Sequence, residues 1–315
     1  MLTYTKELEQ FLLKNNLNNS IGYLTLSGSK AYGTDTPTSD TDIRGFFFSP
    51  FTSLIKLFNK DPDVIEDKDS DIVIYSFNKF VELLTACNPN VIEMLGTRNE
   101  DCYFVSDTAK YMRDNYDMFL SKRAYHTFNG YAFSQLRRLE NALKNGEKKD
   151  KFYDSFAMIK NKEKEYNDIL QKSSKFSYIQ IDKGLIVDGS ISNVLIVDMI
   201  KIFMDMHNII KNYEKVGHRN NKKTEDKLHK HMMHLIRLYY MGIDILKYGE
   251  INTYRNERKF LLSIRNGMVN TNAIFAMVKD LKEEMEDAYK NSKLPEEADK
   301  KHINDWYCNV VKNMI

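Results

Sequence analysis

The segment SGSKAYGTDTPTSDTDIRG, residues 27–45, gathers side chains whose types and spacing suit metal-dependent phosphate chemistry. Gly28 and Ser29 follow an apolar stretch, and glycine permits a tight turn that lets a ligand approach the backbone. Asp40 and Asp42 stand two positions apart, so on a strand their carboxylates would share one face and repel each other. A hard divalent cation relieves such repulsion, because Mg²⁺ binds carboxylate and phosphate oxygens. A solvated turn is the alternative interpretation, since serine and aspartate are turn residues.

Asp71 is the best candidate for a third acid. It begins the segment DIVIYSF, whose β-branched residues predict a strand. If that strand lies beside the one that carries Asp42, three carboxylates meet at one strand end and suit a two-metal site. Asp69 and Glu66 are nearby competitors for this position. In such a site, the turn at Gly28 would donate backbone N–H groups to a triphosphate.

Apolar spacing predicts a mixed α/β unit followed by a mostly helical one. Pro89 falls in the first turn of an expected helix, where proline is tolerated, and Thr5 is placed as the N-cap of another. The fold class is therefore α+β, with a mixed sheet in a catalytic domain at 1–115 and a helical domain at 116–315. Strands are expected at 21–28, 42–50 and 69–77, and helices at 3–17, 78–87, 88–95, 128–139, 227–249 and 272–292.

Composition narrows the class of protein. The chain has 315 residues and a formal net charge of +2, which argues against a globally basic nucleic-acid coat and leaves local basic patches open. Its cysteines are scattered and odd in number, which predicts reduced thiols in a cytosol-like compartment. No apolar run approaches the ~20 residues that span a bilayer. We therefore expect a cytoplasmic protein without a membrane partner.

The whole pattern resembles the signature of the DNA polymerase β-type nucleotidyltransferase superfamily: a Gly-Ser turn, a gap of about ten residues, then two spaced acids. The fuller form, GSKAYGT followed by SDTDIRGFF, resembles one branch, the RlaP-like predicted nucleotidyltransferases associated with RNA repair. The resemblance extends from about residue 20 to about residue 270. Later stretches that agree with it are 71–95, 128–139, 231–251 and 261–267.

This resemblance implies roles for the residues of the opening segment. Gly28 and Ser29 match the nucleotide-cradling turn, and Asp40 and Asp42 match the metal ligands, here for Mg²⁺ or Mn²⁺. Asp71 is the best match for the third acid, which in the superfamily activates the acceptor hydroxyl. One departure is the polar Thr41, because an apolar residue is usual between the two acids.

Other side chains are candidates for nucleotide binding. Lys30 and Arg44 flank the motif and would neutralise triphosphate charge, or else form ordinary salt bridges. Tyr131 and Arg138 lie on an expected helix, where an aromatic ring could stack on a base and a guanidinium could hold a phosphate. The alternative is a helix with Tyr131 partly in the core and its arginines solvated. Arg265 is a weaker phosphate candidate.

Three histidines in one helical stretch suggest a second kind of site. His229, His231 and His234 could bind a metal, but the HExxH pattern of helical zinc sites is missing. Packing on the helical unit is the plainer interpretation. In a third interpretation, His234 and Arg237 face the cleft and contact phosphates. Glu93 is expected to form a pair within its helix or to face solvent, with a place near the cleft as a fourth acid as the alternative.

These observations predict an enzyme that moves a nucleoside monophosphate from an NTP such as ATP to a hydroxyl, with an RNA 3′ end, for example of a tRNA, as the acceptor. Lysine-rich segments at 144–151 and 218–227 would supply the RNA-binding patch. Three alternatives stay open: transfer to a protein or small-molecule hydroxyl, non-catalytic nucleic-acid binding, and a phosphohydrolase that uses the histidines.

Overall fold

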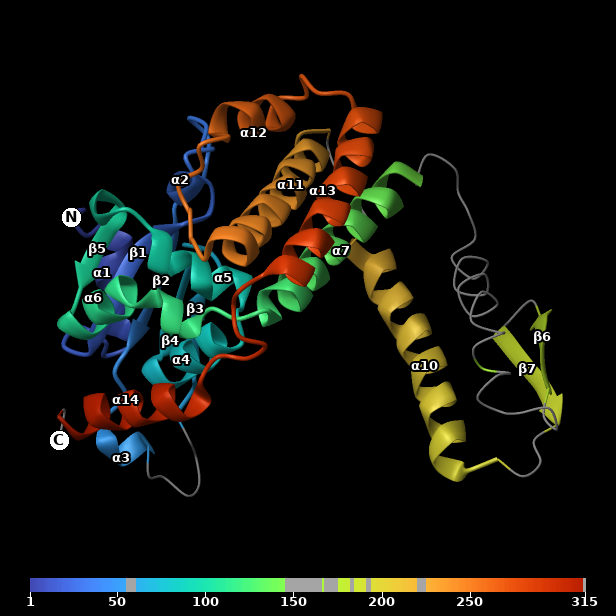
Figure 1. Ribbon diagram of the computed structural model, residues 1–315, viewed down its shortest axis with the longest axis horizontal. Coiled ribbons are helices and arrows are strands. Elements are labelled where there is room, and N and C mark those ends of the chain that lie inside the picture. The colour runs from blue at the N-terminus through green and yellow to red at the C-terminus, as the bar shows by residue number, and fades with distance from the viewer. Residues whose placement is uncertain are drawn as a thin grey trace. The chain divides into compact units, whose positions relative to one another are not determined.

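The computed structural model describes residues 1–54, 61–144, 166, 175–181, 184–190, 194–219 and 225–313. A five-stranded mixed sheet in the order β3-β4-β2-β1-β5 is followed in sequence by long helices (Figure 1). β2 pairs in parallel with β4, whereas the other neighbouring pairs of this sheet are antiparallel. The predicted α+β class is thus confirmed. The strands are β1 Ile21–Ser27, β2 Asp42–Phe47, β3 Val64–Asp67, β4 Ile72–Ser76 and β5 Cys102–Val105.

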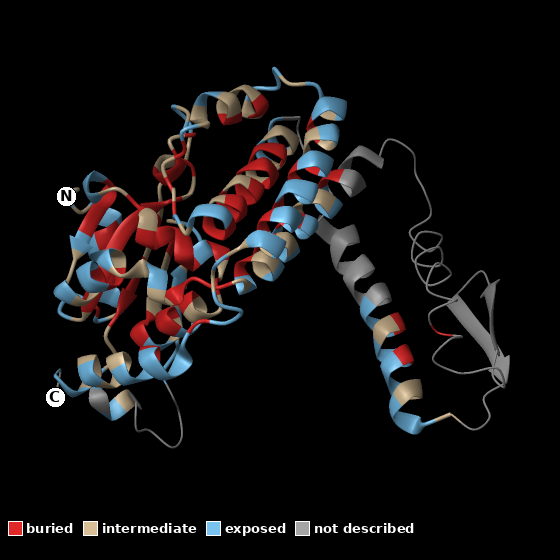
Figure 2. Ribbon diagram, in the orientation of Figure 1, coloured by how far each residue is buried: buried red, intermediate tan, exposed pale blue. Residues whose placement is uncertain are grey.

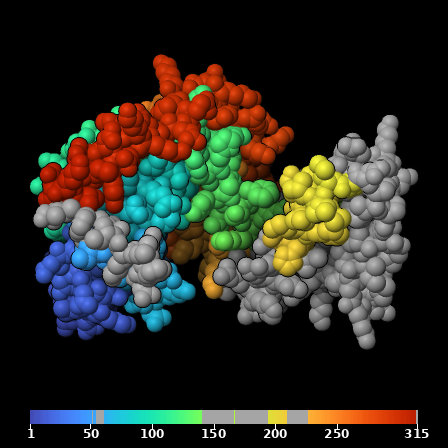
Figure 3. Space-filling view, turned by 90° about the horizontal axis from the view of Figure 1, so that it is seen from below, coloured from blue at the N-terminus to red at the C-terminus, as the bar shows by residue number. Residues whose placement is uncertain are grey.

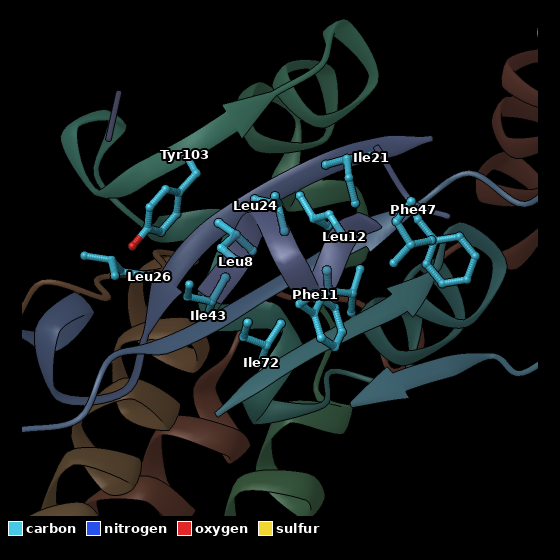
Figure 4. Packing of buried hydrophobic residues seen from close by; sticks show 12 residues of the cluster. Leu8, Phe11, Leu12, Ile21, Leu24, Leu26, Ile43, Phe47, Ile72 and Tyr103 are labelled. Atoms are coloured by element: carbon cyan, nitrogen blue, oxygen red, sulfur yellow. The ribbon is translucent and has the colours of Figure 1, made fainter. Parts of the chain in front are cut away.

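The two faces of the sheet carry different kinds of residue, because successive residues of a strand point to opposite faces. Ile43 of β2 and Ile72 and Ile74 of β4 are buried on one face, where helix α1 (Lys6–Lys14) packs against them with Leu8 and other apolar residues (Figure 4). The alternate residues of the same strands, Asp42 among them, point to the other face. Alternation in β2 and β4 therefore separates an apolar core face from a face that can carry polar chemistry.

Local sequence signals explain where the helices begin and end. The Thr5 side chain accepts a hydrogen bond from the Leu8 N–H, as expected for an N-cap. Asn88 caps α5 in the same way, with Pro89 in the first turn. Gly249, with φ +68°, follows the end of α11. Apart from α1, the helices outside residues 145–224 are α2 Gly28–Tyr32, α3 Phe51–Leu54, α4 Phe77–Thr85, α5 Pro89–Ile92, α6 Asp107–Asp114, α7 Arg123–Lys144, α11 Glu225–Tyr248, α12 Arg258–Arg265, α13 Thr271–Asn291 and α14 Lys300–Lys312. The 3₁₀ turns are η1 Glu93–Gly96, η2 Asn99–Asp101 and η3 Tyr116–Phe119.

By compactness the chain divides into two units. Unit 1 comprises Met1–Arg138 and Glu225–Ile315, and unit 2 comprises Leu139–Thr224. In unit 1 the buried residues run from the sheet into α11, which packs against α12 and α13 (Figure 2). The predicted division into a catalytic domain at 1–115 and a helical domain at 116–315 stays a prediction.

Unit 2 contains one described strand pair within the region that was expected to be mostly helical. The antiparallel strands β6 Lys175–Ile181 and β7 Gly184–Ser190 precede helix α10 Ile196–Arg219. The described part of the chain after β5 is mostly helical, as predicted, and this pair is the exception within it. β3 and β5 were also not predicted, because each has only four residues and so gives little periodic signal.

The C-terminal helix completes unit 1. Trp306 of α14 stacks on Tyr111 of α6 and meets Phe77 of α4 edge-on. In Figure 3 the red C-terminal segment lies across the cyan segment that includes α4. In the part of the chain that the structure describes, no helix is both long enough and apolar enough to cross a membrane.

Candidate active site

A pocket of about 460 Å³ lies on the polar face of the sheet in unit 1. Its lining combines the β1–α2 turn with the second face of β2, β3 and β4 and with three helices. The turn and sheet contribute Ser27, Gly28, Ser29, Tyr32, Asp42, Arg44, Val64, Glu66, Val73 and Tyr75. Helices α5, α7 and α11 and the 3₁₀ turn η1 contribute Asn90, Glu93, Tyr131, Gln135, Lys230, His234, Arg237 and Leu238.

Gly28 and Asp42 are in direct contact at the rim of this pocket. Gly28 has φ +62°, and a Cβ atom built on it would lie 2.0 Å from Oδ2 of Asp42. Only glycine therefore fits, both because of its backbone conformation and because the carboxylate occupies the side-chain space. β1 and β2 produce this contact, because Ser27 pairs with Asp42 in their antiparallel register. The structure therefore places the Gly-Ser turn beside Asp42, as predicted.

Replacing Gly28 with alanine should destabilise the fold and move the Asp42 carboxylate. Left-handed backbone costs a non-glycine residue about 1–3 kcal/mol. The measurement is urea unfolding of the Gly28→Ala variant. Gly130→Ala is the control, because Gly130 is exposed in helix α7 and nothing lies within 4 Å of its would-be Cβ. We expect the control to be stabilised by about 0.5–1 kcal/mol. Equal effects of the two changes would contradict the strained role of Gly28.

Asp42 begins β2, and Asp71 directly precedes β4, the adjacent parallel strand. Ile43 pairs with Ile72, so each aspartate directly precedes a paired residue. Arg44 joins the two positions: its Nη1 donates to the Asp71 carbonyl at 2.7 Å, and its Nη2 lies 3.7 Å from Oδ1 of Asp42. Burial raises the pKa of the Asp42 carboxyl. Arg44 opposes this rise, whereas the charges of Asp71 and Asp40 add to it. The start of β2 therefore concentrates negative charge.

The three predicted carboxylates have different surroundings. Asp40 is exposed and precedes β2, so strand alternation does not determine its direction. Asp71 is half-buried with φ +51°, and Asp42 alone of the three lines the pocket. Glu66 of β3 also lines the pocket, but it pairs with Val73 of β4, so β4 lies between Glu66 and β2. Among the described residues no three His, Cys, Asp or Glu side chains form a group that could hold a metal ion.

Lys30 is tied to the polar residue between the two acids. Its Nζ donates to the Thr41 hydroxyl, and Lys30 does not line the pocket. Thr41 departs from the apolar residue usual at this position, and this hydrogen bond gives it a partner. We infer that Lys30 positions the segment between Asp40 and Asp42 from the outside, while its predicted contact with a nucleotide stays a prediction.

A buried ion pair forms the base of the pocket. Nη1 of Arg237 donates to Oε2 of Glu93 at 2.9 Å, and the Tyr32 hydroxyl donates to Oε1 of Glu93 at 2.6 Å. The Arg237 guanidinium also lies 3.7 Å from the centroid of the Tyr32 ring. The expectation that Glu93 pairs within its own helix or faces solvent is wrong, and its position in the pocket lining agrees with the alternative of an acid near the cleft. The charge of Arg237 is engaged by Glu93, which weighs against a direct phosphate contact.

The remaining α11 side chains of the pocket differ in charge. Lys230 is exposed and lies close enough to Asp42 to lower the pKa of that carboxyl. Burial lowers the pKa of His234 well below its ordinary value, and the charges of Arg237 and Lys230 act in the same direction. His234 is therefore neutral at pH 7, and Lys230 is the α11 cation best placed for an anion near Asp42.

Helix α7 contributes Tyr131 and Gln135 but not the predicted Arg138. The Tyr131 hydroxyl lies 3.3 Å from Nδ2 of Asn88 and 3.4 Å from Nδ2 of Asn90. Oε1 of Gln135 lies 3.0 Å from Nδ1 of His231. Arg138 is exposed and does not line the pocket, so its predicted phosphate contact gains no support from this geometry.

Arg265 holds the loop that leads to the acids. Its Nη1 donates to the Thr34 carbonyl at 2.7 Å, and its Nη2 donates to the Ser39 hydroxyl at 3.1 Å. The same hydroxyl accepts the Thr36 N–H at 2.9 Å. Arg265, which was a weak candidate for a phosphate contact, is instead a positioning residue for residues 34–39.

Replacing Arg265 with alanine should loosen this loop. Hydrogen bonds from a charged group are worth about 1.5–3 kcal/mol, so amide exchange at Thr36 and Ser39 should accelerate by roughly 10-fold or more. Hydrogen–deuterium exchange measures the effect. Lys259→Ala is the control, because Lys259 is exposed on the same helix. Unchanged exchange in the Arg265 variant would show that these contacts do not hold the loop.

Comparison with known proteins identifies the family. Residues 3–158 match the model of the RNA repair pathway DNA polymerase beta family, RlaP. Searches of curated proteins and of solved structures find no match. The matched residues include the Gly28 turn, Asp42, Asp71 and Tyr131. The family links the chain to polymerase-β-type nucleotidyltransferases and to RNA repair. Residues 3–158 therefore belong to the RNA repair pathway DNA polymerase beta family.

Proposed function

We propose that this protein is a metal-dependent nucleotidyltransferase that moves a nucleoside monophosphate from an NTP to an RNA 3′ hydroxyl, for example that of a tRNA, and releases pyrophosphate. One observation carries the proposal: the Asp42 carboxylate lies against the backbone of Gly28 at the rim of a pocket. A glycine turn that a ligand can approach then stands directly beside an acid that a cation can use. Family membership supports the same reaction type.

Asp42 and Asp71 carry the carboxylates that a hard divalent cation would bind at this end of the sheet. The raised pKa of Asp42 reflects burial together with the negative charges of Asp71 and Asp40. Asp42 and Asp71 would hold Mg²⁺ or Mn²⁺, and the exposed Asp40 would have to turn toward them to become a third ligand. When bound, such a cation neutralises phosphate charge and activates the attacking hydroxyl.

The protein's own side chains would position the reactants. The turn at Gly28 and Ser29 would donate to phosphate oxygens, with Lys230 and Arg44 neutralising charge near Asp42. The acceptor oxygen forms a bond to the α-phosphorus as the bond to the β-phosphate bridging oxygen breaks, and pyrophosphate leaves. Asp71 would accept the hydroxyl proton. Positioning and charge neutralisation are the main contributions in this type of reaction.

The RNA acceptor is proposed from the family and from local charge. The two lysine-rich segments predicted to bind RNA are residues 144–151 and 218–227. Most of the first segment, 145–151, and the middle of the second, 220–224, lie outside the described residues. The predicted cytoplasmic location likewise stays a prediction.

A transfer assay tests the proposal. Labelled NTPs with Mg²⁺ or Mn²⁺ are incubated with total RNA, a protein mixture and small hydroxyl compounds in separate reactions. We expect label at RNA 3′ ends, removable by a 3′ exonuclease. Label on protein or on a small molecule would show that this class of compound, and not RNA, is the acceptor. RNA binding without label would favour a non-catalytic binding protein. Activity that is lost in the His231→Ala and His234→Ala variants and kept in Asp40→Asn would favour a phosphohydrolase.

A further inference from the structure

Part of the pocket lies well away from Asp42 and Asp71. The β2–β4 register places Tyr75 four residues along β4 from Asp71, which corresponds to about 13 Å at the usual rise of a strand. Burial raises the pKa of the Tyr75 hydroxyl; Arg44 opposes this rise, and Tyr131, Glu93 and Glu66 lie near enough to add to it. If phosphates bind at the Gly28 turn, this tyrosine-lined part is left for the nucleoside.

The Tyr131 hydroxyl presents a donor to the pocket. The amide groups of Asn88 and Asn90 both donate to its oxygen. A phenol has one proton of its own to give. Because the Tyr131 oxygen already accepts two hydrogen bonds, its O–H group remains to bind a ligand, as a donor.

Gln135 presents a donor as well. Its Oε1 meets Nδ1 of His231 at 3.0 Å, and an amide oxygen can only accept, so the proton in this contact belongs to His231. The Nε2 group of Gln135, which donates twice, is left for the pocket that Gln135 lines. Tyr131 and Gln135 are four residues apart on α7 and therefore share one face of the helix.

We propose that Tyr131 and Gln135 form a base-reading edge that selects guanine over adenine. Two neighbouring donors match two neighbouring acceptors, which guanine offers at N7 and O6, whereas adenine places an amino donor at position 6. The rings of Tyr75 and Tyr131 favour stacking with a base. Helix α7 adds no cation, because neither Arg137 nor Arg138 lines the pocket, whose cations are Arg44, Lys230 and Arg237. This inference rests on the proposed function and deepens it by naming the nucleotide.

Equilibrium binding of GTP, ITP and ATP with Mg²⁺, without acceptor, tests the edge. A bidentate contact of this kind is worth about 1–3 kcal/mol of discrimination, so GTP and ITP should bind roughly 10-fold or more tightly than ATP. ITP keeps N7 and O6 and lacks the 2-amino group. Tyr131→Phe removes the hydroxyl and keeps the ring, and Gln135→Glu replaces donors with acceptors. Both variants should lose most of the preference, whereas Ser134→Ala, exposed on the same helix, should keep it.

The outcomes separate the two proposals. Equal binding of the three nucleotides by the unchanged protein, or tighter binding of ATP, overturns the base-reading edge and leaves the transferase proposal intact. A preference that survives in both variants also overturns the edge, provided that the fluorescence of Trp306, the single tryptophan of the chain, shows them folded. Absence of binding by every nucleotide overturns both proposals.

Discussion

Asp42→Asn is expected to abolish nucleotide transfer, by about 10³-fold or more, without loss of the fold. The amide is nearly the same size as the carboxylate but removes the charge that a divalent cation needs. Because burial and the charges of Asp71 and Asp40 raise the pKa of Asp42, the neutral side chain suits the metal-free protein at least as well. A large loss of transfer with an unchanged or higher unfolding temperature would mark a functional residue.

The sign of the pH dependence follows from the same raised pKa. A carboxyl whose pKa is higher in the folded than in the unfolded state holds its proton more tightly when folded. Its contribution to stability is therefore present at low pH and declines as pH rises from the unfolded value of about 3.9 through the raised folded value. Asp42→Asn should remove this decline, which unfolding curves across pH would measure.

A matched control distinguishes Asp42 from its acidic neighbours. Asp69 is exposed and lies two residues before Asp71, and on sequence alone it is an alternative to Asp71 for the third acid. Asp69→Asn should keep transfer activity and keep the rise in unfolding temperature that Mg²⁺ gives the unchanged protein. Asp42→Asn should lose both. Transfer activity retained in Asp42→Asn and in Asp40→Asn would contradict the mechanism.

Local spacing was sufficient to place Gly28 beside Asp42. Only the short helix α2 and residues 33–41 separate β1 from β2, and the antiparallel pairing of these strands brings the two residues together. The same reasoning failed for Asp40, because β2 begins at Asp42 and strand alternation does not extend to the residue before it. Strand ends depend on pairing partners that spacing alone does not reveal.

The helical side of the pocket could not be predicted in the same way. Arg237 meets Glu93 across 144 positions, and Arg265 meets Thr34 across 231. Amphipathic spacing predicted α11 and its buried face, but it contains no information about which element lies opposite. Gln135 carried a signal, since it shares a helix face with Tyr131, whereas its contact with His231 depends on tertiary packing.

Breaking the ion pair between Glu93 and Arg237 is expected to have the largest effect on stability. Their side chains are 4% and 6% exposed, so loss of one partner leaves a buried charge without compensation. Glu93→Gln and Arg237→Met should each lower the free energy of unfolding by about 3–5 kcal/mol. Urea unfolding followed by Trp306 fluorescence measures this, with exposed Lys259→Ala as the control.

The double variant decides whether the pair acts as a unit. Glu93→Gln with Arg237→Met removes both charges, so its cost should be well below the sum of the single costs, with a coupling of at least about 1 kcal/mol. Simple addition of the two costs would show that the charges do not interact. Glu93 also accepts the Tyr32 hydroxyl, and Tyr32 ends the short helix that begins at Gly28. The ion pair therefore joins the proposed phosphate turn to α11.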